Sequence, residues 1–233
     1  MNIISNESLI RRNARIGQIT MLAGLGVLIG GMIISFQNKV AYQFFISIGA
    51  LVLGFILSQI GIYYTNRWGR RPRPDEILDV ALKGLDNQYT LYHYTTTVSH
   101  LLVGPSGLWI LIPKQQGGTI TYSGGRYRQK GGNLYLKIFA QDSIGRPDLD
   151  VITAESELKK LIDDKLGDEY NSYISSALVF TNAKANIDIT EADDPPAITT
   201  TAGKIKNVIR KEAKNKKMAK AQIDAFNSLF GIE

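Results

Sequence analysis

The chain contains no cysteine and only two histidines among its 233 residues. The absence of cysteine excludes disulfide bonds, thiolate metal sites and cysteine nucleophiles. Two histidines without a glutamate at ligand spacing do not provide a zinc site. The sequence also has no P-loop, no GxGxxG after a strand, no GxSxG and no HExxH. These absences disfavour an ATPase, a dehydrogenase and a serine hydrolase.

Charge is missing from two stretches near the N-terminus, residues 16–36 and 40–66. A helix needs about 20 apolar residues to cross the hydrocarbon core of a bilayer. The two stretches therefore predict a transmembrane helical hairpin over residues 16–66. The alternative is a cleaved signal peptide followed by one anchor. It fits less well, because the first apolar run is long and the second follows after only a few residues.

Arginines flank both stretches: Arg11, Arg12 and Arg15 precede the first, and Arg67, Arg70, Arg71 and Arg73 follow the second. Basic residues near membrane ends favour the cytoplasmic side. We therefore expect both termini to be cytoplasmic at the cell membrane. Residues 1–15 are predicted to be a tail, and residues 67–74 a basic, proline-rich linker.

Small residues lie on the first apolar stretch. Gly26 and Gly30 have GxxxG spacing, with Gly24 and Gly31 beside them. Such residues let transmembrane helices approach closely. We expect this face to pack against the second span of the same hairpin, and dimerisation is the alternative.

The soluble part alternates helical and strand patterns. The expected elements are a helix from Pro74 with apolar positions Ile77, Val80, Ala81 and Leu85, strands over 89–95, 100–103, 108–112, 119–122, 126–129 and 133–137, a helix over 148–166, a buried strand over 175–180, and a last helical region from Thr201 to about Leu229. This order predicts an α/β domain with a mixed central sheet.

Residues 98–114 are the most informative segment, because they predict two strands joined by a Gly-Pro-Ser-Gly turn and ending in a lysine. In this outline the chain resembles the nuclease-related domain (NERD) family, a branch of the PD-(D/E)xK nuclease-like fold. The residues that carry the resemblance are Asp75-Glu76 for the family's Gly-Glu, Val98-Ser99-His100 for Ile-Asp-His, Gly104-Pro105-Ser106-Gly107 for Gly-Pro-x-Gly, and Ile112-Pro113-Lys114 for Glu-x-Lys. The resemblance covers about Pro74 to Ile209.

The resemblance implies a divalent metal held by an aspartate and a glutamate, with the lysine orienting the attacking water. Ser99 and Ile112 stand at the two acidic positions. Mg²⁺ requires oxygen ligands, and phosphodiester cleavage of this type depends on the metal. We therefore interpret Glu76, Ser99, Ile112 and Lys114 as vestiges of a site that holds no metal and no cofactor.

Two alternatives keep a metal site. One is a divergent nuclease that uses Glu76, Lys114 and a relocated acid with Mg²⁺ or Mn²⁺. The other rebuilds the site from Glu76, Asp79 and His100, since residues three apart share a helix face. The plainer interpretation makes the acids a solvated helix start, Lys114 a lysine at a strand end, and both histidines structural residues.

The C-terminal segment is strongly basic, and its binding candidates are Lys204, Lys206, Arg210, Lys211 and Lys214. Apolar residues recur at helical spacing through the same segment, which predicts a basic amphipathic helix over 204–233. Such a helix lies on an anionic lipid surface, binds nucleic-acid phosphates, or packs its apolar side on the sheet and leaves a solvated basic face.

Basic and aromatic residues alternate around Arg126, Tyr127 and Arg128. This pattern is typical of strands that stack bases, and also of two-sided strands whose arginines extend into solvent. We include Arg126 and Arg128 among the binding candidates.

The sequence thus predicts two N-terminal transmembrane helices and a cytoplasmic, NERD-like α/β domain over 75–203. The hypothesis for function is a membrane-anchored, non-catalytic module that serves in interaction or nucleic-acid association. The divergent nuclease and a structural or sensory membrane protein are the alternatives.

Overall fold

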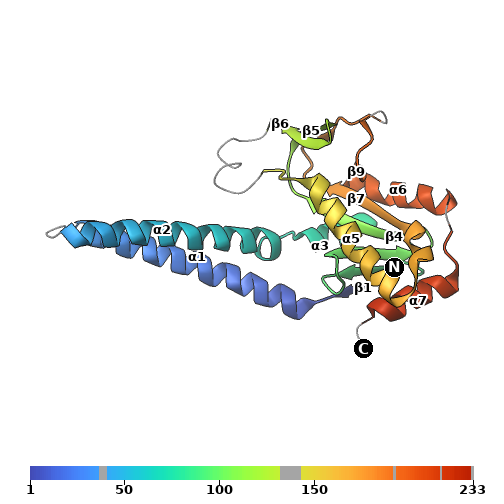
Figure 1. The fold of residues 1–233 in the computed structure, drawn as a ribbon, viewed down its shortest axis with the longest axis horizontal. Helices are drawn as coiled ribbons and strands as arrows, with labels where there is room; N and C mark the ends of the chain where they lie inside the picture. The colour runs from blue at the N-terminus through green and yellow to red at the C-terminus, as the bar shows by residue number, and fades with distance from the viewer. Residues whose placement is uncertain (37–40, 132–142, 191–192, 216, 232–233) are drawn as a thin grey trace. The chain divides into compact units, whose positions relative to one another are not determined.

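The structure is a computed structural model that describes residues 1–36, 41–131, 143–190, 193–215 and 217–231. Figure 1 shows the chain, which divides into two compact units. One unit is Glu7–Arg73, and the other joins Met1–Asn6 to Pro74–Glu233. The strand predicted over 133–137 lies outside the described residues.

The first unit is a helical hairpin of α1 (Glu7–Phe36), α2 (Ala41–Tyr64) and a five-residue π-helix, η1 (Thr65–Gly69). Its two long helices confirm the two predicted apolar helices, and both are long and apolar enough to cross a membrane. Only 11% and 17% of their most apolar windows are buried. The apolar surface of the hairpin therefore faces outward, unlike that of a core helix.

Close packing within the hairpin depends on glycines. A Cβ atom added to Gly24 would lie 3.0 Å from the Ser58 backbone nitrogen, and one added to Gly31 would lie 2.6 Å from the Ala50 Cβ. A Cβ added to Gly26 or Gly30 would meet nothing within 4 Å. The intramolecular contact thus forms through the neighbours of the GxxxG pair rather than through the pair itself.

We expect Gly24→Leu to destabilise the hairpin by about 2 kcal/mol, because a side chain there must push the helix backbones apart. Gly26→Leu on the same helix is the matched control and is expected to change stability by less than about 0.5 kcal/mol. Denaturant unfolding of the full chain in detergent micelles measures both. A larger loss for Gly26→Leu would instead indicate that the GxxxG face packs against another chain.

The second unit is built on a six-stranded sheet with the order β1-β2-β3-β4-β7-β9. The strands are β1 (Asn2–Ser5), β2 (Thr90–His93), β3 (His100–Gly104), β4 (Gly107–Lys114), β7 (Ile174–Phe180) and β9 (Ile198–Thr201). The β2–β3 and β3–β4 pairs are antiparallel, whereas β1–β2, β4–β7 and β7–β9 are parallel. The predicted α/β domain with a mixed sheet is therefore confirmed.

A second, three-stranded sheet has the order β6-β5-β8. Its strands are β5 (Gly118–Ser123), β6 (Arg126–Lys130) and β8 (Ala185–Ile187).

The N-terminus differs from the predicted tail over residues 1–15. Asn2–Ser5 forms the edge strand β1, parallel to β2, and Glu7 begins α1. The short strand carries no alternation long enough to predict, and only its partner β2, some 90 residues away, identifies it. The sheet unit therefore takes strands from both sides of the hairpin in the sequence.

One face of the six-stranded sheet carries α3 (Pro74–Leu82) and α6 (Ala202–Asn215). Their apolar side chains pack on the sheet in one cluster, which includes Leu78, Leu82, Trp109, Leu111, Ile205 and Ile209. The predicted apolar face of α3 was partly wrong, since Val80 is 74% exposed.

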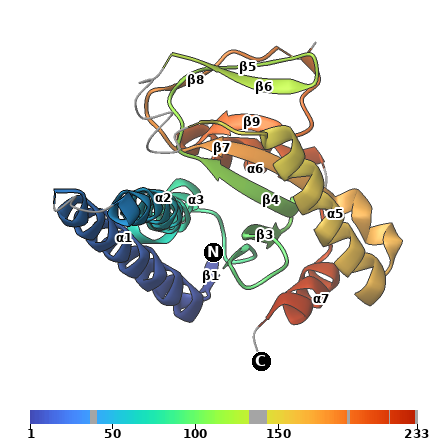
Figure 2. The same ribbon diagram turned by 60° about the vertical axis from the view of Figure 1, so that its left-hand side comes forward.

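The opposite face carries α5 (Pro147–Lys165), a 3₁₀-helix η2 (Asp168–Tyr173) and α7 (Lys220–Phe230). The predicted single helix over 204–233 is therefore wrong, because α6 and α7 pack on different faces of the sheet. Residues 204–233 belong to the same compact unit as the sheet rather than to a separate segment. Figure 2 shows α5 and α3 on the two sides of β4.

Candidate functional site

Positions 99 and 112 lie at one end of the β3–β4 hairpin. The β3–β4 register pairs Leu101 with Ile110, and Ser99 lies in the bend just before β3. Ile112 packs with Leu158 and Ile162 of α5 in the apolar cluster on that face. The site position that the resemblance assigns to a glutamate is therefore part of a hydrophobic contact.

Lys114 points to the same face, because it is two residues from Ile112 on β4. Its Nζ lies 2.6 Å from Asp150 Oδ2 on α5, and its side chain is 15% exposed. Asp150 is an acid that sequence reasoning missed. The only sequence feature that marks Asp150 is its position in the acidic first turn of α5, and nothing in the sequence links that turn to β4.

Glu76 belongs to the other face of the sheet. It lies on α3, whose Leu78 and Leu82 pack against Trp109 and Leu111. These two β4 residues alternate with those that face α5, since successive strand residues point to opposite faces. The structure thus brings Ile112 and Lys114 to one face, sets the helix of Glu76 on the other, and leaves Ser99 in the bend before β3.

A different group of side chains comes together beneath α3. His93 and His100 are paired across β2 and β3, and their Nδ1 atoms are 2.7 Å apart. His93 Nε2 lies 2.9 Å from Asp79 Oδ1 on α3. Both imidazoles are buried, and the Tyr94 ring packs edge-on against His100 with 4.8 Å between centroids. In the alternative metal site of Glu76, Asp79 and His100, the structure connects Asp79 and His100 through their hydrogen bonds to His93.

The Asp79–His93–His100 chain is a row of hydrogen-bonded side chains rather than a converging set of metal ligands. A metal needs several ligands that converge on one point. The two histidines instead direct their Nδ1 atoms at each other, and among the described residues no group of three or more His, Asp or Glu side chains is arranged so that it could hold a metal ion.

The strand β6 is two-sided. Arg126 and Arg128 are exposed, whereas Tyr127 is buried and its hydroxyl lies 2.9 Å from Thr199 Oγ1. Burial raises the pKa of Tyr127 to about 12, although the hydrogen bond to Thr199 lowers it in part. The arginines and this tyrosine therefore do not share a surface on which a base stacks.

Two of the basic candidates on α6 bind the turn that follows α3. Lys206 Nζ donates to Lys83 O at 2.9 Å, and Arg210 Nη2 donates to Gly84 O at 2.7 Å. These two carbonyls directly follow Leu82, the last residue of α3, and cations near a helix C-terminus are favourable for the helix dipole. Lys206 and Arg210 thus have hydrogen-bond partners within the fold, and their prediction as binding residues stays a prediction.

The other three candidates, Lys204, Lys211 and Lys214, are exposed. They lie on the face of α6 opposite to the buried Ile205 and Ile209, because residues seven apart return to nearly the same side of a helix. Lys204 and Lys214 are separated by about 15 Å of helix at 1.5 Å per residue. These three residues, called the lysine row below, form an extended cationic strip.

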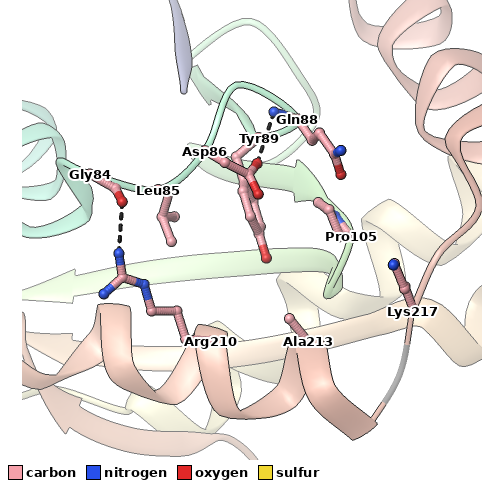
Figure 3. Close-up of a pocket in the computed structure, with 9 residues that line it drawn as sticks. All are labelled: Gly84, Leu85, Asp86, Gln88, Tyr89, Pro105, Arg210, Ala213 and Lys217. Atoms are coloured by element: carbon pink, nitrogen blue, oxygen red, sulfur yellow. Dashed lines mark hydrogen bonds between the residues drawn. The ribbon is translucent and has the colours of Figure 1, made fainter.

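A polar hollow of about 410 Å³ lies between α6 and the turn that follows α3. Figure 3 shows Arg210 and Lys217 on either side of the Tyr89 ring. Asp86 also lines the hollow, so its charges are mixed, and Arg210 is already bonded to Gly84. The hollow does not present a converging set of groups for one class of ligand.

Comparisons of the chain with family models, with curated proteins and with solved structures find no match.

Proposed function

We propose that the chain is a membrane-anchored, non-catalytic domain that associates with phosphate-bearing polyanions through the lysine row. The sequence motifs resemble those of the NERD family, and a core of that type would serve here as a scaffold. The single observation that carries the non-catalytic assignment is the ion pair of Lys114 with Asp150, at 2.6 Å beside an apolar Ile112.

The hairpin supports the membrane part of the proposal. Exposed side chains such as Leu22 and Phe45, at 69% and 71%, need an apolar environment. The sheet unit contains β1 before the hairpin and α3 after it. Two spans that leave from and return to one folded unit keep both ends on one side of the bilayer. The seven flanking arginines favour the cytoplasmic side for that unit, and so for both termini.

The ion pair supports the non-catalytic part. A lysine that orients a nucleophilic water needs a metal-bound water next to it, and the metal needs oxygen ligands. In this chain the lysine is bound to a carboxylate from α5, position 112 offers no oxygen, and Glu76 lies on a helix of the opposite face. The positive charge of Lys114 is therefore paired with Asp150 within the fold.

The lysine row supports the association with phosphate. Its side chains are exposed, and they are spread along one side of a helix as contacts to a linear polyanion require. Phosphate comes from a lipid headgroup or from a nucleic acid, and the same row fits both sources.

The test combines cleavage and binding on the full chain in detergent micelles. We expect plasmid and single-stranded DNA to remain uncut with Mg²⁺ or Mn²⁺. We expect binding to DNA or RNA that weakens steeply with salt, or binding of the full chain in nanodiscs that grows with anionic lipid content. Cleavage abolished by both Glu76→Ala and Lys114→Ala would establish the divergent nuclease instead. Binding to neither source would exclude the polyanion role.

A further inference from the structure

Four exposed arginines gather at one end of the helical hairpin: Arg11, Arg12 and Arg15 on α1, and Arg70 directly after η1. These four residues are called the arginine collar below. Residues 7–73 contain seven arginines and a single acid, Glu7, so this end of the hairpin has a large excess of positive charge. Like charges four residues apart on a helix, such as those of Arg11 and Arg15, destabilise it. An anion bound to the collar offsets this repulsion.

The packing of the hairpin sets the arginines of the two segments at similar heights. A Cβ atom added to Gly17 of α1 would lie 3.0 Å from the Thr65 backbone nitrogen, at the start of η1. Because α1 and α2 run antiparallel, one further turn brings Asn13 level with Trp68, and both are 9% exposed. The Arg70 amide donates to Thr65 O at 2.7 Å and so fixes Arg70 at the end of η1. The arginines of α1 and Arg70 therefore lie at the same end of the hairpin.

The collar also lies at the depth of lipid headgroups. Residues 16–36 extend about 30 Å as a helix at 1.5 Å per residue, which equals the thickness of the hydrocarbon core. Arg15 directly precedes this span. It shares a helix side with Ile19 and Leu22, which are 58% and 69% exposed, because residues three and four apart are neighbours on a helix surface. Acyl chains that cover Ile19 and Leu22 thus place a headgroup beside Arg15.

Aromatic side chains at the same end give a second indication of this depth. Tyr63, Tyr64 and Trp68 form ring contacts with one another. The Arg67 Cζ lies 4.9 Å from the Trp68 ring centroid, and its Nη1 lies 3.5 Å from the Tyr63 hydroxyl oxygen. Such amphipathic rings prefer the boundary between hydrocarbon and water. The end of the hairpin that carries the collar therefore has the composition of a membrane interface.

We infer that the arginine collar binds the phosphates of anionic phospholipids in the leaflet that surrounds it. A guanidinium presents paired donors that match phosphate oxygens, and clusters of basic residues next to transmembrane helices bind anionic headgroups. The inference rests on the membrane-spanning hairpin of the proposed function, but it involves no residue of the lysine row. It assigns a lipid class to the hairpin itself.

Replacing three collar residues, as Arg12→Gln, Arg15→Gln and Arg70→Gln together, tests the inference. Native mass spectrometry of the full chain, released from nonionic detergent micelles with added phosphatidylglycerol or phosphatidylcholine, measures the affinity for each lipid. We expect the parent chain to prefer phosphatidylglycerol, because the ammonium group of phosphatidylcholine cancels its phosphate charge. In the variant the affinity for phosphatidylglycerol should fall about 100-fold, since each basic residue near an anionic surface contributes about fivefold.

Two further variants separate the collar from net charge and from a loss of folding. Lys204→Gln, Lys211→Gln and Lys214→Gln together remove the same charge from the sheet unit, and this variant is expected to keep the preference for phosphatidylglycerol. Lysine in place of arginine at the three collar positions keeps the charge, so most of the preference should remain. A loss in the lysine variant as large as in the glutamine variant would overturn the inference.

The remaining outcomes distinguish the inference from the proposed function. Equal affinity of the parent chain for the two lipids would overturn the inference and leave the membrane-spanning hairpin in place. So would a preference that the lysine-row variant loses and the collar variant keeps, since the lysine row would then hold the lipid. Retention of neither lipid by the parent chain would overturn the inference together with the membrane part of the proposed function.

Discussion

Gly107→Ala is expected to lower the free energy of unfolding of the sheet unit by about 3 kcal/mol. Gly107 closes the β3–β4 hairpin opposite Gly104 and has φ +104°, a conformation that L side chains rarely adopt. An added Cβ would lie 2.5 Å from the Tyr173 carbonyl oxygen, which precedes the paired strand β7. Backbone strain of this kind costs about 1–3 kcal/mol, and overpacking costs a similar amount.

The matched control for this prediction is Gly124→Ala. Gly124 also has a positive φ, +59°, but a Cβ there would meet nothing within 4 Å. We expect a loss of only about 1 kcal/mol, from the backbone conformation alone. Denaturant unfolding followed by Trp109 fluorescence, in a Trp68→Phe background, measures both variants. Equal losses would mean that the approach to Tyr173 carries no energetic cost.

Replacing the lysine row with glutamine, as Lys204→Gln, Lys211→Gln and Lys214→Gln together, is expected to weaken polyanion binding about 100-fold. Each lysine near an anionic surface contributes about 1 kcal/mol, and about 1.4 kcal/mol corresponds to a factor of ten. With DNA, the slope of log affinity against log salt should fall in magnitude by about 2.7, because each phosphate contact contributes about 0.9. The buried side of α6 is unchanged, so the fold should persist.

A control with the same loss of charge uses three other exposed lysines, Lys160→Gln, Lys165→Gln and Lys184→Gln. Binding by this variant should change much less, since long-range charge effects are screened beyond about 8 Å at physiological salt. Fluorescence anisotropy with labelled DNA and co-sedimentation of nanodiscs of defined lipid content measure the two sources of phosphate. Equal weakening in both triple variants would show that net charge, rather than the row, governs binding.

Local pattern was sufficient for the hairpin motif and for most strands. The Gly104–Gly107 turn, the flanking apolar runs and the β7 strand were predicted within one or two residues, because each pattern is complete over a short segment. The same reasoning missed β1, β8 and β9, which have three or four residues each. Such short strands form because a partner strand hydrogen-bonds to them, rather than because of their own β-propensity.

The candidate sites show the same division. The sequence showed that Ser99 and Ile112 stand where the resemblance expects acids, and it raised Asp79 and His100 as members of one group. It did not identify Asp150 as the partner of Lys114 or His93 as the link between Asp79 and His100. Both pairings join elements separated by loops, and no local spacing specifies them.

By itself, the sequence determined the chemistry that is present and where it occurs along the chain: two uncharged stretches, a set of apolar strands and a basic C-terminal segment. Tertiary structure alone decided which partners the charged and polar side chains bind. It assigned Lys206 and Arg210 to the turn that follows α3, Lys114 to Asp150, and the two histidines to one buried pair. The physical reason is that helical and strand periodicity fixes which residues share a face, whereas only the packing of distant elements fixes what that face meets.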